Sequence, residues 1–424
     1  MRKKILIIGG GFAGLTFAKK IDDKKFEVVL IDKTNHHLFQ PLLYQVATAA
    51  LSPGDISAPL REVLRNKNIE IIMGEVEKIL PFEKKIIMDG EELTYDFLVL
   101  AVGARHSYFG NNYWEFLAPG LKTLSDALEI REKILYSFEL AEKLYGKTDI
   151  KSYLNFVIIG GGPTGVEMAG AIAEIARFSL LKDFKKIDTK ETKVFLIEAQ
   201  SRILPGYDPK LSLKAQEDLE HLGVKVLTNS FVANITEEGV YIKGNLFIPA
   251  KTIIWAAGNQ ASQLISDLPC KKDKLGRAIV EKDLSIKEFP EIFVIGDAAA
   301  FKNDQGNYLP AIAPVAIQQG KYLAEIFNQE IPLEIRKPFK YFHRGNMATI
   351  GKARAVAEIK RLKLSGFIAW LAWTFVHILF LIKFRNKLKV LIEWFIYYIT
   401  NRHSVRIITK RFKENFPAIK EKAL

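Results

Sequence analysis

Cysteine is almost absent from this chain of 424 residues, since Cys270 is the single one. One thiol cannot form a disulfide, a multi-thiolate metal site or a dithiol redox couple within the chain. A long apolar run is also absent at the start, where the run at residues 5–8 stops at Gly9. That short run is more typical of a buried parallel strand than of a signal peptide.

Acidic residues are scarce in only one part of the sequence. The formal net charge is +13, and residues 360–424 hold 14 Lys and Arg against 3 Asp and Glu, so +11 of the charge lies there. The preceding body is nearly neutral, and it is long enough for two or three domains with real cores. We therefore expect no nucleic-acid partner, and we expect the basic tail to meet an anionic membrane surface.

A strand, a glycine turn and a helix occur twice along the chain. The two copies are KKILIIGGGFAGLTFAKKI at 3–21 and LNFVIIGGGPTGVEMAGAIAEIA at 154–176. Each copy leads to another apolar strand that ends in an acid, at 26–32 and at 193–199, and further strands are expected at 95–104, 251–258 and 291–299. The sequence therefore predicts an α/β fold with two Rossmann-type dinucleotide-binding domains. Between them, a helix capped by Thr123 or Ser125 is expected to run toward Gly146.

Gly9, Gly11 and Gly14 form the first G-x-G-x-x-G motif, between a strand and a helix. Such glycines allow a tight turn, close approach of the backbone to a pyrophosphate and close packing of helix on strand. Asp32 follows 23 residues after Gly9, where a carboxylate can bind the adenosine ribose. An ordinary tight turn is the alternative, but the strand, helix and acid together favour a dinucleotide.

Gly160, Gly162 and Gly165 repeat the motif, and Glu198 follows 38 residues after Gly160. The usual spacing is about 20 residues, and we attribute the excess to a longer helix and a basic segment before the strand. A carboxylate at this place accepts the ribose 2′-OH and repels a 2′-phosphate, so we expect NADH rather than NADPH. The nearby Arg202 leaves that preference open.

Asp297 stands in the sequence IGDAA, at the end of an expected strand and before an expected helix. In flavoproteins that hold two dinucleotides, an aspartate at such a place meets the ribityl and phosphate end of FAD. A helix N-cap is the alternative interpretation, and one aspartate can serve both roles.

Several further segments are distinctive: HHLFQPLLYQVATAALSP at 36–53, GLKTLSDALEIR from 120, EAQSRILPGYDP at 198–209, APVAIQQG at 313–320 and an aromatic tail from 366. With the glycine motifs, they make nearly the whole chain resemble the type II NADH dehydrogenases, single-subunit NADH:quinone oxidoreductases that do not pump protons. The resemblance implies a glutathione-reductase-like fold, in which NADH reduces FAD and a membrane quinone of the respiratory chain takes the electrons. It implies a location on the cytoplasmic face of the cell membrane.

The resemblance also assigns cofactor-binding residues in this sequence. The residues expected to hold FAD are Gly9, Gly11, Gly14, Asp32, Ala101, Gly103 and Asp297. Those expected to hold NADH are Gly160, Gly162, Gly165, Glu167, Glu198, Ala257 and Gly258.

The family's quinone motif, A-Q-x-A-x-Q, is altered here, because Pro314 stands at the first glutamine position and Gln318, followed by Gln319, at the second. The first quinone contact is therefore in question, and helix surface or domain packing is the alternative role of the two glutamines. Glu167 is either an exposed acid favoured by the helix dipole or a carboxylate that relays protons between nicotinamide and quinone. We take Glu167, Gln318 and Gln319 as the catalytic candidates. No metal site is expected, because three histidines lack partners at ligand spacing: His36, His37 and His377.

The tail contains two aromatic stretches. Residues 364–382 have no Asp, Glu, Lys or Arg, and such a run of about 17 to 25 residues can span a bilayer. Its tryptophans and the basic residues that follow it favour the membrane interface instead, and the second stretch, at 390–400, is too short to span. We expect amphipathic helices that anchor the protein peripherally or monotopically, with a homodimer contact as the alternative use of the same surface.

The expected domains are an FAD-binding domain at 1–115 and 270–350, an NADH-binding domain at 116–269 and a membrane-anchoring region at 351–424. Three other functions compete with the quinone reductase. A sulfide:quinone oxidoreductase needs redox cysteines, which Cys270 alone does not provide. A soluble NADH:ferredoxin or rubredoxin reductase would not need the tail. A nucleotide-sensing, membrane-associated protein would be recognised by its failure to oxidise NADH.

Overall fold

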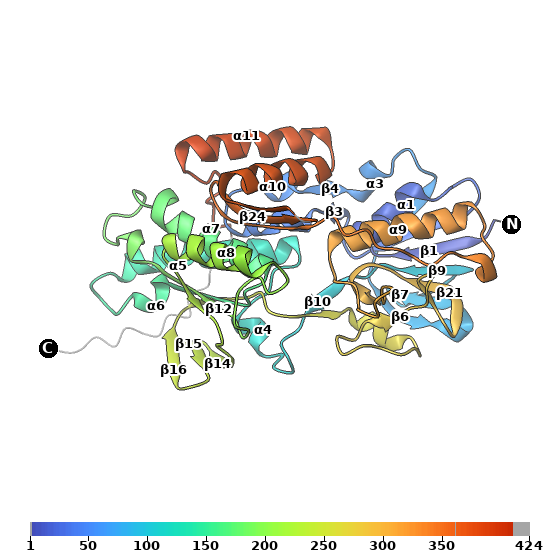
Figure 1. Cartoon of the computed structure of the whole chain (residues 1–424), viewed down its shortest axis with the longest axis horizontal. Helices are drawn as coiled ribbons and strands as arrows, with labels where there is room; N and C mark the ends of the chain where they lie inside the picture. The colour runs from blue at the N-terminus through green and yellow to red at the C-terminus, as the bar shows by residue number, and fades with distance from the viewer. Residues whose placement is uncertain (1, 361, 410–424) are drawn as a thin grey trace.

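Two parallel sheets organise the fold, one in each lobe of the molecule (Figure 1). The structure is a computed structural model that describes residues 2–360 and 362–409. The strands of the first sheet are β1 (Lys4–Ile8), β2 (Glu27–Asp32), β5 (Ile69–Met73), β9 (Phe97–Leu100), β20 (Ser285–Ile286) and β21 (Phe289–Val294). Those of the second are β11 (Asn155–Ile159), β12 (Lys193–Ile197), β13 (Val224–Leu227) and β17 (Thr252–Trp255). The orders are β20-β21-β9-β1-β2-β5 and β13-β12-β11-β17, and β20 alone pairs antiparallel.

The central strand of each sheet is apolar on both faces. β1 has its last four residues buried and β11 is buried throughout. This is the expected pattern for a parallel strand that is covered by helices on both sides of the sheet. Each segment that the sequence predicted as a strand overlaps one of these strands, so the prediction of two βαβ units is confirmed.

Close helix packing places the elements around each glycine turn. In the first lobe, α1 (Phe12–Lys20) lies against α9 (Ala313–Asn328), and a Cβ at Gly320 would lie 2.4 Å from the carbonyl oxygen of Ala13. In the second lobe, α7 (Pro163–Glu174) follows β11, and a Cβ at Gly170 would lie 1.7 Å from the carbonyl oxygen of Ile350. Only glycine allows approaches this close.

Two short strands connect the lobes. β10 (Ala104–His106) pairs antiparallel with β18 (Asn259–Ala261), so the chain enters and leaves the second lobe side by side. The predicted helix follows as α5 (Leu124–Leu144), which begins at the capping box formed by Thr123 and Asp126. The expected boundaries at 115/116 and 269/270 each fall shortly after a connecting strand, and they remain a prediction.

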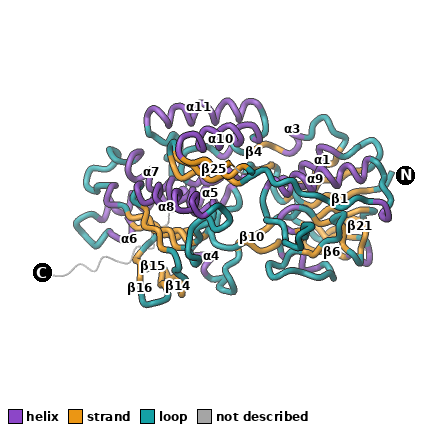
Figure 2. Tube along the Cα trace, viewed as in Figure 1, coloured by secondary structure: helices purple, strands orange, loops and turns teal. Residues whose placement is uncertain are grey.

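The C-terminal part adds a small sheet and two helices. The sheet has β23 (Asn346–Gly351), β24 (Arg354–Ile359) and β25 (Leu362–Ser365), and the helices are α10 (Gly366–Phe380) and α11 (Phe384–Thr400). Figures 1 and 2 show α10 and α11 lying next to each other over this sheet. α11 begins earlier than the stretch at 390–400 predicted, so its first turns carry basic residues. No helix in residues 2–360 and 362–409 combines the length and the apolar character that crossing a membrane requires.

Candidate active site

The first glycine turn is closed on its inner side and open on its outer side. Gly9 has φ of +102°, and a Cβ there would lie 2.4 Å from the carbonyl oxygen of Ala101. A Cβ at Gly14 would lie 1.9 Å from the carbonyl oxygen of Gly9, whereas one at Gly11 would meet nothing within 4 Å. The backbone around Gly11 is therefore accessible to a pyrophosphate at the N-terminus of α1, as FAD binding requires.

The second glycine turn has the same geometry. Gly160 has φ of +111°, and a Cβ there would lie 2.7 Å from the carbonyl oxygen of Ala256. A Cβ at Gly165 would lie 1.8 Å from the carbonyl oxygen of Gly160, and one at Gly162 would again meet nothing within 4 Å. The turn before α7 thus fits a second dinucleotide.

The acid after each repeat lies directly beside its turn. The backbone N–H of Gly10 donates to Oδ2 of Asp32 at 2.6 Å, and that of Gly161 donates to Oε2 of Glu198 at 2.6 Å. In the second repeat α7 continues into a π-helical turn, Ile175–Ser179, and a long connection follows. The extra length before Glu198 therefore lies outside the nucleotide turn, as expected.

The remaining residues predicted for FAD lie at the ends of the strands of the first sheet. Ala101 and Gly103 follow β9, and Gly103 has φ of +65° with open space where a Cβ would be. Asp297 lies in a single 3-10 turn, Gly296–Ala298, which leads into the short strand β22 (Ala299–Ala300). The α-helix predicted after Asp297 is therefore wrong, because the chain continues as strand, and Asp297 caps no α-helix. Burial raises the pKa of Asp297, while Lys122 and Arg277 lower it.

A pocket of about 570 Å³, part of it open to solvent, lies where the two lobes meet. We term it the interdomain pocket, and its lining residues are Gln40, Leu43, Tyr44, His106, Leu121, Lys122, Thr164, Glu167, Ala256 and Asn259. Burial lowers the pKa of His106 to about 4, so this ring is neutral at physiological pH. Ala257 and Gly258 stand in the chain between the lining residues Ala256 and Asn259 and do not themselves line this pocket, so their predicted role near the nicotinamide stays a prediction.

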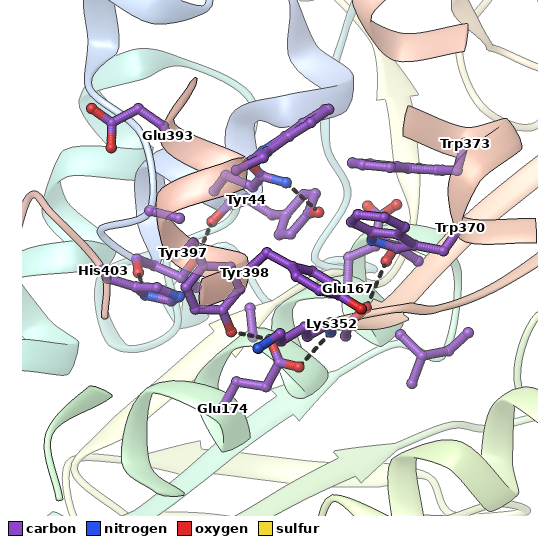
Figure 3. Close-up of a pocket in the computed structure, with 18 residues that line it drawn as sticks. Tyr44, Glu167, Glu174, Lys352, Trp370, Trp373, Glu393, Tyr397, Tyr398 and His403 are labelled. Carbon is purple, nitrogen blue, oxygen red and sulfur yellow. Dashed lines mark hydrogen bonds between the residues drawn. The ribbon is translucent and has the colours of Figure 1, made fainter. Parts of the chain in front are cut away.

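A second pocket, of about 660 Å³ and also partly open, lies between α7 and the C-terminal helices (Figure 3). We term it the aromatic pocket. Its ring-bearing lining residues are Tyr44, Trp370, Trp373, Trp394, Tyr397, Tyr398 and His403. Its polar lining residues include Gln45, Glu167, Glu174, Lys352 and Glu393. Tyr44 and Glu167 line both pockets, so the two cavities meet at these side chains.

Glu167 is a half-buried acid in the second turn of α7, not an exposed one in the first turn. Burial raises its pKa well above the ordinary value of 4.5, and the backbone N–H of Thr349 partly opposes this shift. The negative charge of Glu167 in turn adds to the burial that raises the pKa values of Tyr44 and Tyr207. A carboxyl so placed holds its proton more tightly than a free carboxyl does.

Gln318 and Gln319 line neither of the two pockets. The side-chain amide of Gln318 makes two hydrogen bonds to the backbone of Phe342. It donates to the carbonyl oxygen at 3.0 Å and accepts from the N–H at 2.9 Å. Gln319 is buried, and its Oε1 accepts from the N–H of Gly296 at 2.7 Å. The structure therefore separates these glutamines from Glu167, and Gln319 supports the turn that carries Asp297. Pro314 occupies the first turn of α9, where a missing N–H is harmless.

Sequence reasoning missed most of the aromatic pocket. The aromatic residues of α10 and α11 were expected at the membrane interface, yet Trp373 is 2% exposed. Glu174 was also missed, although its position seven residues after Glu167 puts both acids on one face of a helix. That spacing was the available signal.

Comparison with known proteins follows the same division of the chain. The family model described as pyridine nucleotide-disulphide oxidoreductase matches residues 3–320, and that of the NDH2 C-terminal domain matches residues 343–403. Two type II NADH:quinone oxidoreductases of Mycobacterium tuberculosis are 39% and 40% identical to this chain, over 96% and 97% of it and 90% of each relative.

Solved structures show the same fold. NDH2 from Plasmodium falciparum, determined in complex with NADH, superposes with a TM-score of 0.87 at 23% identity, over 97% of this chain and 100% of that one. The sulfide:quinone oxidoreductase of Aquifex aeolicus gives 0.71 at 19% identity, over 91% and 92%. With the sequence identities to the mycobacterial enzymes, these matches show that the chain belongs to the type II NADH:quinone oxidoreductase family.

Proposed function

We propose that this protein oxidises NADH and reduces a membrane quinone to quinol, with FAD between them and without proton pumping. The observation that carries the proposal is the meeting of the two pockets at Tyr44 and Glu167. The interdomain pocket reaches the second glycine turn at Thr164, and the aromatic pocket is walled by aromatic rings, so a nucleotide side and a quinone side share one boundary.

The glycine turns and their acids hold the two dinucleotides. Gly9, Gly11 and Gly14 would hold FAD, with Asp32, Ala101, Gly103 and Asp297 as its further binding residues. Gly160, Gly162 and Gly165 would hold NADH, with Glu198 as the acceptor for the adenosine ribose and Ala257 and Gly258 as the candidates on the nicotinamide side. FAD supplies the redox chemistry, accepting a hydride and passing on electrons. The chain supplies orientation and the exclusion of water.

The aromatic pocket takes the quinone ring. Planar rings stack well on Trp and Tyr side chains, and Trp370, Trp394 and Tyr398 offer such surfaces on α10 and α11. Glu167 lies at the end of this pocket that faces the nicotinamide side, where it holds or transfers a proton. Gln318 and Gln319 act from outside the pocket, through the turn at Asp297 and the chain at Phe342.

The outer faces of α10 and α11 rest on the cytoplasmic leaflet of the cell membrane. They expose large apolar side chains, among them Phe375 at 69% and Phe395 at 66%, beside basic residues such as Arg385 and Lys387. Apolar burial combined with attraction to anionic lipid is how interfacial helices bind membranes. A homodimer contact is the competing use of this surface.

A flavin spectrum tests the proposal directly. The purified protein should carry the visible absorption of oxidised flavin, lose it anaerobically with NADH and regain it when a short-chain quinone is added. Absence of flavin, or of bleaching by NADH, would contradict the assignment and would support a nucleotide-binding protein without turnover. If NADH bleaches the flavin but no quinone restores its absorption, the reduction of FAD by NADH would stand and the proposed reduction of quinone would be contradicted.

A further inference from the structure

A second carboxylate closes the far end of the aromatic pocket. Glu174, at the last residue of α7, exposes only 6% of its surface. The hydroxyl of Tyr397 on α11 donates to its Oε2 at 2.7 Å, and the backbone N–H of Lys352, in the turn between β23 and β24, donates to its Oε1 (Figure 3). Three separate elements therefore position this one carboxyl at the wall of the cavity.

Glu167 and Glu174 share one face of α7 with a small residue between them. Residues at i, i+4 and i+7 of a helix lie above one another, and here they are Glu167, Ala171 and Glu174, all of which line the aromatic pocket. Because Ala171 adds little bulk, the helix face between the two acids stays open to the cavity. A ring that enters the pocket thus has one carboxyl near each end.

The reaction itself requires a proton that NADH does not carry. The balance is NADH + H⁺ + quinone giving NAD⁺ + quinol, so one proton must come from solvent through groups of this chain. We propose that Glu174 stores this proton at the inner wall of the aromatic pocket and gives it to one quinone oxygen, with Tyr397 holding the carboxyl in position. The inference rests on the proposed quinone function.

In this step the O–H bond of the Glu174 carboxyl breaks and its electron pair stays on the carboxylate. A new O–H bond forms on the quinone oxygen, while the two electrons originate from NADH and arrive through FAD. A proton from solvent then restores the Glu174 carboxyl. Atoms and charge balance without any further reactant.

The groups around Glu174 come from every element packed against it. Lys352 and Arg354 approach from the β23–β24 hairpin, Tyr397 from α11 and Tyr44 from α2 (Leu43–Ala47). Burial raises the pKa of Glu174, and the N–H of Lys352, the hydroxyl of Tyr397 and the two cations partly oppose the shift. A buried carboxyl with a raised pKa can be protonated closer to neutral pH than a free one, as a proton donor must be.

Lys352 is itself directed away from the acid. Its Nζ donates to Oδ1 of Asn401 at 2.6 Å and lies 4.7 Å from the centre of the Tyr398 ring. His403 packs its ring on Tyr397, and burial lowers the pKa of His403 to about 4, so this neighbour is neutral. The nearest positive charge is therefore tied to α11 and does not form a direct ion pair with Glu174.

The test is Glu174→Gln in the full-length, FAD-loaded protein, with three readouts. We expect anaerobic bleaching by NADH and the reduction of ferricyanide, which takes electrons without protons, to stay within about twofold of the wild type. Turnover with a short-chain quinone should fall by about 100-fold or more, as for loss of a general acid. The loss of wild-type quinone turnover toward alkaline pH should also weaken or shift in the variant, because a donor fails once it is deprotonated.

Tyr397→Phe keeps the acid and removes the hydroxyl that positions it. Quinone turnover should therefore fall less than in Glu174→Gln, and the pH at which turnover is lost on the alkaline side should shift. Matched controls lie outside both pockets. Glu142→Gln changes a carboxylate that accepts N–H groups of residues 185–187, and Tyr322→Phe removes one hydroxyl bonded to the carbonyl oxygen of Lys337. Both controls should retain quinone turnover.

The outcomes separate the inference from the function on which it rests. If the wild type reduces quinone and Glu174→Gln does so equally well with an unchanged pH profile, Glu174 is not the donor. If the variant loses ferricyanide and quinone reduction together, or loses FAD, its role is structural and the inference is overturned. If the wild type bleaches with NADH but reduces no quinone, the proposed function itself fails.

Discussion

The carboxylate of Glu198 accepts a hydrogen bond of 2.6 Å from the backbone N–H of Gly161, inside the second glycine turn. Its other oxygen accepts from the N–H of Gln200 at 2.8 Å, and the side chain is 8% exposed. The acid is therefore fixed beside the place where the adenosine ribose must lie. Asp32 stands in the same relation to Gly10 in the first repeat.

This arrangement predicts a preference for NADH over NADPH. A 2′-phosphate would face the fixed Glu198 carboxylate, and a preference of about 10-fold or more in kcat/KM follows from roughly 1.4 kcal/mol of repulsion. Glu198→Gln keeps an acceptor for Gly161 and removes the charge, so it should narrow the gap. Equal kcat/KM for the two nucleotides in the wild type would contradict the assignment of Glu198.

Glu167 predicts a pH-dependent stability. Burial raises the pKa of Glu167 in the folded protein above 4.5. Its favourable contribution to the free energy of unfolding is therefore fully present below about pH 4.5, and it is lost as pH rises through the pKa of the folded state. Each tenfold difference in proton affinity between the folded and unfolded states corresponds to about 1.4 kcal/mol. Glu167→Gln should therefore raise the melting temperature above that of the wild type at pH 7 to 8. This difference in melting temperature should shrink toward pH 4.5. A variant that is less stable than the wild type at pH 8 would contradict the prediction.

The sequence predicted the two Rossmann units because their signal is local. The apolar runs, the glycine turns and the acids at Asp32 and Glu198 are each set by a few consecutive residues, and the structure has the strands where they were expected. The short strand after Asp297 was missed because the sequence IGDAA is equally compatible with the start of a helix. Propensity alone could not decide between them.

The aromatic pocket could not be predicted in the same way, because it is assembled from contacts far apart in the chain. Trp394 on α11 donates to Gln45 on α2 at 2.7 Å, and Tyr397 bonds to Glu174 across more than 200 residues. A stretch rich in Trp and Phe indicates burial or a membrane interface equally well. Here α10 serves two environments, since Trp373 is buried while Phe375 is 69% exposed.

Cys270 predicts a silent substitution. The thiol is half-buried beside the hydrophobic core of the first lobe, and burial raises its pKa, which makes it a poor nucleophile. Cys270→Ser should keep the NADH:quinone activity within about twofold and alter stability by about 1 kcal/mol or less. Loss of quinone reduction with FAD still bound would show that a thiol takes part in the redox chemistry.

The docking of α11 depends on a buried acid. Nζ of Lys389 lies 2.6 Å from Oδ1 of Asp55, which is 1% exposed, while Oδ2 of Asp55 accepts from the N–H of Ser52. Lys389→Met would leave the buried Asp55 carboxylate without its ion-pair partner, at an expected loss of about 1–3 kcal/mol in the free energy of unfolding. Lys387→Met on the same helix is the comparison, because the Nζ of Lys387 donates to the uncharged carbonyl oxygen of Leu379. Equal stability of the two variants in chemical denaturation would contradict this role of Asp55.

The outer face of the C-terminal helices makes the membrane proposal testable by point substitutions. Removing the tail is unsuitable, because Trp373 and Val390 belong to the core and the aromatic pocket would be lost with them. Phe375, Phe395 and Ile399 are between 64% and 69% exposed, so replacing all three with Ser should leave the fold intact.

Apolar burial contributes about 25 cal/mol per Å², and the triple variant should therefore shift from vesicles containing anionic lipid to the supernatant in sedimentation. Turnover with a long-chain quinone in vesicles should fall, while turnover with a short-chain quinone in solution should not. Phe231→Ser and Phe247→Ser, at exposed positions in the second lobe, provide the control. High salt should release part of the wild type by screening the basic residues. If the triple variant binds vesicles as well as the wild type does, the exposed face does not contact lipid. If the triple substitution instead dissociates a dimer that the wild type forms, this face is a protein contact.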